Sequence, residues 1–524
     1  MQHAGVDTGS ARWDVRLVPA ALSSWIVTAA GIRWPVGGAA ALVCLALAAW
    51  SGALWWHGRS RRSACTRTVS VGLLGAAVVG AGFGLAIALR TEAVDHHPVT
   101  AAFGHAVAVT VTPTESAIGV GRGRLLFRAT LHRLGTDEMS GRVVVFAPAA
   151  DFGEVVAGQP LRFTARIGRP VRRDLTIAAL NATGKPAVGR AGWVHRAAHM
   201  VRDRFAVAAR EVLPAAQAAT LPALVLGDTS GVTALTGREF RAAGLTHLTA
   251  VSGANVTIVC GAVLFSARLI GPRAAVGLAA VALVVFVIVV QPTASVLRAA
   301  VMGAIALLGM LSSRRRQAIP SLCAAVLVLM VAAPQLAVDV GFALSVVATA
   351  ALVVIAPVWS RRMVSRGCPK PLADAVCVAC AAQVVTAPLV AGISGRVSVV
   401  AAVANLAAAP VIVPITVLGT AAATVGVCWP AAAQLLIRFT GPEVWWVLSV
   451  AHWAAMVPGA SMPVPVGLPG VIVVGACAVL VVTLWRWRWF RVVAGSAVVC
   501  LMGWALSGLI SDPSASVGHD TIVK

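Results

Sequence analysis

The chain has 524 residues, of which 59% are hydrophobic and 12% are charged, whereas about a quarter of the residues in a soluble globular protein are charged. This composition excludes a cytosolic enzyme, a disordered regulator and a secreted scaffold. The formal net charge is +23 at pH 7, and all but three of the 42 basic residues are arginine. The cytoplasmic loops of membrane proteins are rich in basic residues, which accounts for part of this excess of positive charge. The rest suits a polyanionic partner such as nucleic acid or anionic lipid.

The chain opens with a polar stretch and three apolar segments, at residues 17–34, 37–56 and 69–89. No small-residue cleavage site follows a compact apolar core, so we expect no cleaved signal peptide. The loop after His57 is dense in arginine, which places that loop and the N-terminus in the cytoplasm. Three crossings then bring the chain after Arg90 to the outer face.

Residues 98–190 are less hydrophobic and alternate between apolar and polar side chains, as strands with one buried face do. Because no cysteine lies between Cys65 and Cys260, this segment has no intrachain disulfide. The length and the strand count fit a small barrel of the OB type outside the membrane. The five expected strands are 104–111, 124–132, 141–147, 161–167 and 174–181.

Two amphipathic helices are expected next, at 191–213 and 232–244, and the first has the pattern of a helix lying on the membrane surface. His195, His199 and Asp203 recur at every fourth position of the first helix. A metal site has such spacing, and so does the polar side of an interfacial helix, which is the interpretation we favour.

About ten further apolar segments follow from His247. If each crosses the membrane in turn, all of the arginine-bearing loops between them lie on the cytoplasmic side. Pro410 and Pro414 could divide the segment 399–428 into half-helices. The predicted fold is a polytopic α-helical membrane protein of about 11–13 transmembrane helices, with an extracytoplasmic OB-like β-barrel inserted after the third helix. The ten segments are 246–270, 275–291, 294–311, 318–333, 338–358, 372–392, 399–428, 443–458, 466–484 and 492–510.

This threading predicts five parts. They are N-terminal transmembrane helices over 1–97, the OB-like β-domain over 98–190, amphipathic interfacial helices over 191–245, a transmembrane channel block over 246–510 and a short C-terminal tail over 511–524.

The sequence lacks the motifs of several enzyme classes. Gly184-Lys185 is followed by Pro186, so no phosphate-binding loop of a nucleotide-hydrolysing motor is present. There is no H-E-x-x-H and no H-x-H-x-D-H run of the metallo-β-lactamase type. Cys377 and Cys380 form a C-x-x-C inside an apolar run, where core thiols are the better interpretation. We therefore expect no catalytic activity, no cofactor and no metal.

Polar side chains inside the apolar segments are candidates for a transport path, because such groups must find partners or face water. For some of them the alternative is hydrogen bonding between helices, with Gly253 allowing close packing. An arginine at membrane depth also needs a partner, for which Asp339 is a candidate, although Asp339 could instead cap a helix. The candidates are His247, Ser252, Asn255, Arg298, Asp339, Gln383 and Asn405.

Basic side chains on the polar faces of two predicted strands are candidates for contact with DNA. Phe127 and Phe163 alternate onto the core side of these strands, so stacking aromatics are missing from the basic faces. An ordinary solvated surface explains the basic residues about as well as a DNA track does. The candidates are Arg124, Arg128, His132, Arg162 and Arg166.

Several short motifs accompany this order of parts. They are Leu226-Gly-Asp228, Phe240, Gly244-Leu-x-His247, Ala250-Val-Ser-Gly253, Val296-Leu-Arg-Ala299 with Met302, and Gly341-Phe-x-Leu-Ser345. Together with the three N-terminal segments and the external β-domain, they resemble the ComEC family, the inner-membrane DNA channels of bacterial natural competence. The resemblance covers roughly residues 15–490.

The resemblance implies a multi-pass inner-membrane channel that takes up single-stranded DNA during transformation, in contact with membrane lipids. It further implies a separate DNA receptor and a cytoplasmic ATPase or single-strand-binding protein that pulls the strand, and it leaves a homo-oligomer open. Many family members carry a C-terminal metallo-β-lactamase-like domain. This chain stops after its last apolar segment, so we expect the channel without the nuclease, which a separate protein would supply.

Two other functions fit the residues. One is a transporter of a smaller anionic solute or lipid, with the β-domain as a regulatory module. The other is a membrane scaffold without transport, in which the intramembrane polar residues would tolerate apolar replacement.

Overall fold

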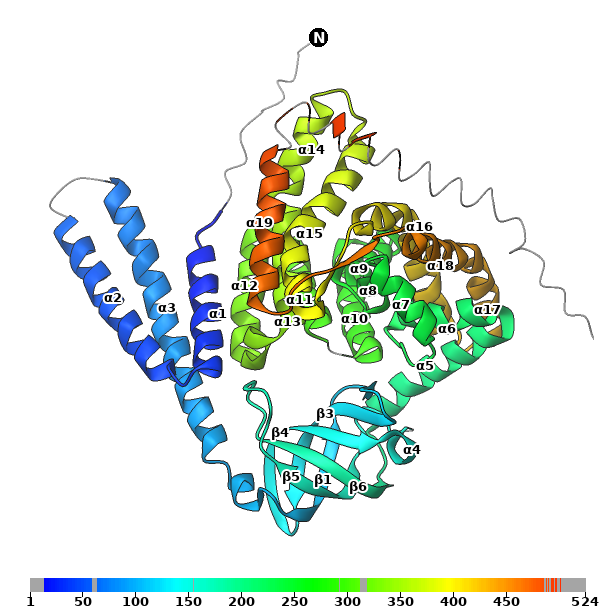
Figure 1. Cartoon of the computed structure of the whole chain (residues 1–524), viewed down its shortest axis with the longest axis horizontal. Coiled ribbons are helices and arrows are strands. Elements are labelled where there is room, and N and C mark those ends of the chain that lie inside the picture. Colours follow the sequence, from blue (N-terminus) through cyan, green and yellow to red (C-terminus); the bar gives the residue numbers. More distant parts are fainter. Residues whose placement is uncertain are drawn as a thin grey trace, which may run out of the picture. The chain divides into compact units, whose positions relative to one another are not determined.

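A computed structural model of the chain describes residues 14–58, 64–153, 155–291, 293–311 and 318–484, and scattered positions between 487 and 500. The described part is mostly helical and contains one closed β-barrel (Figure 1). The chain divides into two compact units. Unit 1 comprises Met1–Arg204 and Ser252–Val346, and unit 2 comprises Phe205–Val251 and Val347–Lys524.

Three helices open unit 1: α1 (Val18–Arg33), α2 (Gly37–Gly58) and α3 (Ala64–Asp95). They confirm the three N-terminal apolar segments. Helix α3 packs along α1 and α2. With 32 residues it is roughly 48 Å long at helical rise, which exceeds the ~30 Å hydrocarbon core of a bilayer. It extends beyond the predicted end at residue 89 and leads through the short helix η1 (Pro98–Ala102) into the barrel.

The barrel confirms the predicted OB-like domain. Strand β1 pairs with β3 and β5, β3 with β4, and β5 with β6, all antiparallel, whereas β4 and β6 are parallel. The barrel is built from β1, β3, β4, β5 and β6. Numbered one to five in chain order, these strands follow one another around the closed barrel as 1-2-3-5-4, which is the arrangement of an OB fold. A short helix, α4, precedes the fourth of them, β5. The elements are β1 (Ala106–Pro113), β2 (Ile118–Gly119), β3 (Arg124–Leu134), β4 (Asp137–Pro148), α4 (Ala149–Phe152), β5 (Leu161–Gly168) and β6 (Ala178–Val188).

The last predicted strand begins later than expected. Residues 174–177 form a turn, in which the Asp174 carboxylate accepts a hydrogen bond from the backbone N–H of Thr176. Leu175 has a φ of 64°, in the left-handed region. Side chains at such turns bond to their own backbone rather than to a neighbouring strand, so β6 starts at Ala178.

The core of the barrel is apolar and is closed at one end by a phenylalanine. Phe127 and Phe163 are buried, as the alternation predicted. Phe152 of α4 lies between them, with its ring centroid 5.2 Å from that of Phe163 and 6.4 Å from that of Phe127. Such edge and tilted contacts of aromatic rings stabilise a core beyond the area that they bury.

The rest of unit 1 is helical and contains a packed group in which α9 contacts α10 and α11, α11 contacts α12, and α1 contacts α12. Trp25 of α1 donates a hydrogen bond from Nε1 to the carbonyl oxygen of Ala337 over 2.9 Å, which ties α1 to the segment before α13. The elements are α9 (Gly253–Ala267), α10 (Pro272–Val290), α11 (Ala294–Leu311), α12 (Ala318–Ala332), η2 (Pro334–Val338) and α13 (Val340–Val354), which continues into unit 2.

Unit 2 is built around α16, which contacts α6, α15, α17 and α18. The predicted amphipathic helices are present as α5 (Trp193–Val212), which begins in unit 1 and continues into unit 2, and α7 (Ala234–Ala242). The further elements are α6 (Ala215–Leu226), α8 (Thr246–Thr249), α14 (Ala356–Val364), α15 (Lys370–Ser394), β7 (Arg396–Ser398), α16 (Ala401–Val425), α17 (Pro430–Phe439), α18 (Gly441–Met456), β8 (Ser461–Pro463) and α19 (Leu468–Leu484).

The expected division of the segment 399–428 at its prolines is wrong. Helix α16 runs unbroken through Pro410 and Pro414. Proline removes a backbone donor and disturbs the carbonyl groups of the preceding turn. Trp446 of α18 donates a hydrogen bond from Nε1 to the carbonyl oxygen of Ala407 in that turn over 2.9 Å. This hydrogen bond fixes α18 against the turn that precedes Pro410.

Six helical segments of the described chain are long and apolar enough to cross a membrane, which agrees with a polytopic helical membrane protein. Five further apolar helices have 10–17 residues, and most of the predicted segment 492–510 lies outside the described residues. The six segments are Gly37–Trp56, Ser70–Ala102, Pro272–Val290, Val340–Val364, Lys370–Ser394 and Ala401–Val425.

Candidate functional site

The polar segment that enters the first apolar span of the channel block is broken. At helical spacing, the predicted segment 246–270 would be one helix with His247, Val251 and Asn255 on one face and Ser252 one position round. Instead α8 ends at Thr249, and Ala250 and Ser252 have extended backbones before α9 begins at Gly253. Serine favours the position before a helix, where its backbone leaves the helical region. The single polar face predicted for these residues is therefore wrong.

Arg298 is the most buried charged candidate, with 6% of its surface exposed. It is the fifth residue of α11. Its Nε donates a hydrogen bond to Ser345 Oγ of α13 over 2.6 Å, and its Nη1 lies 3.2 Å from Met302 Sδ. Ser295 Oγ lies 3.3 Å from Ser345 Oγ. The guanidinium is thus held by hydroxyl and thioether groups of two helices.

Asp339 is not the partner of Arg298. The Asp339 Oδ1 atom accepts a hydrogen bond from the backbone N–H of Phe342 over 2.8 Å, which caps the first turn of α13. A carboxylate is stabilised at this end of a helix. Within the described parts of the chain, Arg298 forms no ion pair. The capping interpretation of Asp339 is confirmed, and the pairing is wrong.

The guanidinium of Arg298 also lies against α9. A Cβ atom added to Gly253 would lie 2.9 Å from Arg298 Nη2 and 3.3 Å from Ala299 Cβ, so only glycine fits here without a shift. Gly253, Arg298, Met302 and Ser345 come from three separate sequence motifs, and the structure brings them together. Sequence reasoning proposed Arg298 alone as a site residue, although the serine and the glycine were visible in the motifs.

One other candidate, Gln383, lies at a hydrogen-bonded junction of unit 2. Gln383 Nε2 donates a hydrogen bond to the carbonyl oxygen of Ser398 over 3.3 Å. Ser398 Oγ in turn donates to the carbonyl oxygen of Ala242 over 2.6 Å. At the end of α7, Gly244 has a φ of 71°, and a Cβ there would lie 2.4 Å from Ala401 Cβ. Gln383 is therefore placed to fix the junction between α7 and α16.

His247, Ser252, Asn255 and Asn405 differ in their surroundings. His247 is exposed, whereas Asn255 has 4% of its surface exposed. Ser252 Oγ lies 3.5 Å from Asn255 Oδ1, a long contact at the start of α9. Asn405 is half-buried on α16. Ser252 and Asn255 belong to unit 1 with Arg298, whereas His247, Gln383 and Asn405 belong to unit 2.

The five basic candidates of the barrel do not share one face. Arg124, Arg128 and His132 lie on β3, whereas Arg162 and Arg166 lie on β5, and these two strands do not pair with each other. OB folds bind oligonucleotides on the face of the second and third strands, here β3 and β4. Arg162 and Arg166 therefore lie off the usual ligand face. Four candidates bond within the barrel domain: Arg124 with Asn181, Arg128 with Glu115, His132 with Thr112 and Arg166 with the Gly104 carbonyl oxygen.

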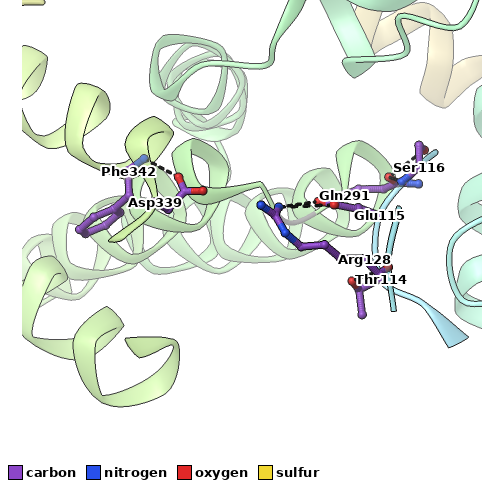
Figure 2. Close-up of polar contacts among 7 residues, drawn as sticks. All are labelled: Thr114, Glu115, Ser116, Arg128, Gln291, Asp339 and Phe342. Atoms are coloured by element: carbon purple, nitrogen blue, oxygen red, sulfur yellow. Dashed lines mark hydrogen bonds and ion pairs between the residues drawn. The ribbon is translucent and has the colours of Figure 1, made fainter. Parts of the chain in front are cut away.

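The β3–β4 face carries an ion pair and an additional arginine that the sequence did not single out. Arg128 Nη1 lies 3.3 Å from Glu115 Oε2, as Figure 2 shows. Arg142 of β4 has a buried Nη1 atom without a hydrogen-bond partner among the described residues. Burial lowers the pKa of Arg142, an effect that the charges of Asp174, Glu115 and Asp339 partly offset. The influence of Asp339 means that this face lies near the start of α13.

A second contact joins the barrel to the helices of unit 1. The backbone N–H and the hydroxyl of Ser116, in the loop after β1, both donate to Gln291 Oε1, over 3.3 and 3.1 Å (Figure 2). Gln291 follows α10 and has a φ of 76° with a ψ of 145°. Residues other than glycine rarely adopt this conformation, which costs of the order of 1–3 kcal/mol. The surrounding contacts thus hold a strained residue in place.

The histidines of α5 contact the barrel. His199 Nε2 lies 3.3 Å from the carbonyl oxygen of Ala157, and a Cβ on Gly158 would lie 2.3 Å from the His195 ring. Both contacts place these rings against the segment that leads into β5. Across the part of the chain that the structure describes, no group of three or more His, Cys, Asp or Glu residues is arranged to hold a metal ion.

A family model described as "Competence protein" matches residues 224–490, which is just over half of the chain. No curated protein and no solved structure matches the chain significantly. The matched region contains the motifs that meet at Arg298 and the junction at Gly244. It also follows a closed barrel of OB topology, in a chain with membrane-length apolar helices. The chain therefore belongs to the competence protein family, the ComEC family of DNA uptake.

Proposed function

We propose that the chain conducts single-stranded DNA inward across the inner membrane during natural transformation. Membership of the competence family supports a role in DNA uptake. The observation that carries the proposal is the β3–β4 face of the barrel. On the strands that OB folds use for oligonucleotides, this face presents Arg128 and Arg142 beside the start of α13, within one unit that also contains apolar helices.

The proposed orientation places the N-terminus and the arginine-rich loops in the cytoplasm and the barrel outside. Arg361, Arg362 and Arg366 lie in and just after α14 and are exposed, which fits a cytoplasmic loop. The chain acts as a conduit without a catalytic step. Strand degradation, delivery of DNA and pulling are assigned to a separate nuclease, a separate receptor and a cytoplasmic motor or single-strand-binding protein.

Our candidates for the lining of a water-filled transport path are the polar groups of His247, Ser252, Asn255, Arg298, Gln383 and Asn405. Few of them are cationic. A path with few strong cationic sites suits a moving polyanion, because tight binding of each phosphate would stall the strand. Local hydrogen bonds of Gln383 support a second role in bracing the fold of unit 2.

The test uses full-length protein in liposomes that contain a single-strand-binding protein, which supplies the pull from inside. End-labelled single-stranded DNA is added outside, followed by a nuclease. We expect the label to become protected with time, and double-stranded DNA of equal length to remain accessible. Impermeant maleimide, applied to Arg122→Cys and Arg366→Cys in a cysteine-free background, identifies the vesicles with the barrel outside. No protected strand in those vesicles would contradict DNA conduction.

The alternative function, transport of a smaller anionic solute or lipid, is favoured by one observation. The surroundings of Arg298 consist of a single guanidinium with serine hydroxyls, which suits any oxyanion. Labelled sulfate measured in the same vesicles separates the two functions. Sulfate flux without strand protection would favour the alternative.

A further inference from the structure

Arg298 is buried, and no described residue supplies it with a counter-charge. Its surroundings are Ser345 Oγ, Met302 Sδ and the backbone of α9, and no carboxylate pairs with it in the described ranges. Removing a charge from water is costly unless hydrogen bonds and an opposite charge compensate. Two of the three guanidinium nitrogens, Nε and Nη1, have contacts, whereas Nη2 forms no hydrogen bond with a described residue.

The Nη2 atom faces the N-terminal turn of α9. The position of a Cβ on Gly253, 2.9 Å from Nη2 and 3.8 Å from Cζ, fixes this approach. The first amides of a helix lack acceptors and carry a partial positive charge. Ser252, which precedes α9, provides no side-chain capping hydrogen bond to them. The guanidinium therefore lies against the positive end of a 15-residue helix, and no described carboxylate forms an ion pair with it.

We propose that Arg298 and the N-terminal turn of α9 form a binding site for one phosphate oxyanion, with the hydroxyls of Ser252, Ser295 and Ser345 around it. Helix N-termini bind phosphate through their free amides. A guanidinium adds a charged fork that matches two phosphate oxygens. The Asn255 N–H already donates to the Ser252 carbonyl oxygen over 3.1 Å. An oxyanion at this place would satisfy Nη2 and the remaining first-turn amides, those of Gly253 and Ala254.

The ligand that we assign is the phosphodiester of the translocating DNA strand, an assignment that rests on the proposed function. The groups assigned to the site are a guanidinium, serine hydroxyls and backbone amides, which suit a phosphate rather than a base edge, so the site holds the backbone irrespective of sequence. A single guanidinium and one helix end bind each phosphodiester weakly enough for the next one to replace it. The site therefore acts as a step along the path, through which every phosphate passes.

The test measures anion binding by the full chain in a maltoside detergent, which carries no phosphate. Sulfate replaces chloride at constant ionic strength, and the thermal midpoint is recorded as a function of sulfate concentration. We expect sulfate to stabilise the wild-type protein. Arg298→Gln removes the charge, and Gly253→Ala pushes the guanidinium away from α9. Either change should weaken the apparent sulfate affinity at least about tenfold, the effect of losing one charged hydrogen bond.

The matched control is Arg273→Gln, which removes an exposed arginine at the start of α10 in the same unit. It should leave the sulfate response unchanged. If Arg298→Gln does not fold, Gly253→Ala, which retains every charge, still tests the geometry. Equal sulfate affinity in wild type and Gly253→Ala, with the arginine variant also unchanged where it folds, would overturn the site.

Three further arms identify the natural source of the phosphate. A short oligothymidylate with phosphodiester linkages should compete with sulfate at the Arg298-dependent site, whereas its uncharged methylphosphonate analogue and added phosphatidylglycerol should not. Competition by the lipid alone would overturn the DNA assignment. In the vesicle assay, strand protection that is equal in wild type and Gly253→Ala would refute this step while leaving DNA conduction intact. A sulfate site without any strand protection would instead remove the phosphodiester as ligand.

Discussion

The contact of His199 of α5 with the barrel makes the stability of the folded chain depend on pH. Burial lowers the pKa of the His199 ring below its ordinary value of 6.5, and the nearby charge of Arg202 acts in the same direction, while the hydrogen bond to Ala157 and the charge of Asp203 oppose them. The folded state therefore holds the ring neutral under conditions in which the unfolded chain binds a proton. The contribution of the neutral His199 ring to stability is therefore fully present above pH 6.5 and is lost as the pH decreases below it.

We expect the thermal midpoint of the full chain to decline as the pH falls from about 6.5 to about 5.5, and His199→Gln to reduce this decline. His105→Gln, which alters an exposed histidine of the barrel, serves as the control and should keep the wild-type slope. If the His199 variant has the same slope as wild type, the ring does not couple protonation to folding.

Arg298 shows how far single residues could be predicted. A lone arginine in an apolar run signals a buried charge that needs partners, and this much was readable from the sequence. Its partner was not, because Ser345 and Asp339 lie on the same helix only two turns apart. Which of them faces Arg298 depends on the rotation of α13, and that is set by packing against neighbours such as α1, where Trp25 contacts Phe342.

The β1–β2 loop contacts Gln291, which lies between the apolar helices α10 and α11, and this contact holds the barrel against them. Gln291→Ala removes both hydrogen bonds from Ser116 but keeps the unfavourable φ of 76°. Gln291→Gly also removes the bonds, but it relieves the strain. We therefore expect the β1–β2 loop to exchange its amide hydrogens faster in both variants, and the thermal midpoint to fall more for alanine than for glycine.

Hydrogen exchange of residues 114–118 in nanodiscs measures the first effect, and thermal unfolding measures the second. Thr136→Ala, in the exposed turn between β3 and β4, controls for changes elsewhere on the barrel. Unchanged exchange at the β1–β2 loop in both variants would mean that the Ser116 contact does not hold the loop.

Helices and strands could be predicted where the hydrophobic periodicity was strong. They could not be predicted where the backbone conformation alone sets the end of an element. The barrel strands alternate clearly, so their number, their inward residues and the OB closure followed from the pattern. The break between α8 and α9 did not follow, because the predicted apolar segment 246–270 runs across residues 250–252, whose extended backbone ends one helix before the next begins. Conversely, Pro410 and Pro414 suggested breaks, but α16 is continuous through both.

At the scale of the whole molecule, hydropathy identified the class but not the number of crossings. Six segments have membrane length, whereas helices such as α9 and α12 are apolar but have only 15 residues. A helix of that length spans roughly 22 Å, less than the ~30 Å of a typical hydrocarbon core. Whether such a helix crosses depends on its tilt and on how its neighbours shield its ends, and composition carries no information about either.

The two proposed functions of the molecule predict different roles for the barrel. If it receives DNA, the basic residues of the β3–β4 face should matter and those of β5 should not. Arg128→Gln combined with Arg142→Gln neutralises the first set, and Arg162→Gln combined with Arg166→Gln makes the same change of charge on the other side. We expect the first pair alone to slow strand protection severalfold.

The salt dependence of strand binding gives an independent measure of the same contacts. Each lost phosphate contact reduces the slope of log affinity against log salt by about 0.7 for a single strand. Two lost contacts should reduce it by roughly twice that amount in the β3–β4 pair, with little change in the β5 pair. If both pairs reduce the slope equally, the DNA track encircles the barrel rather than following the OB face. If neither pair alters binding or uptake while sulfate flux persists, the barrel acts as a regulatory module of a small-anion transporter.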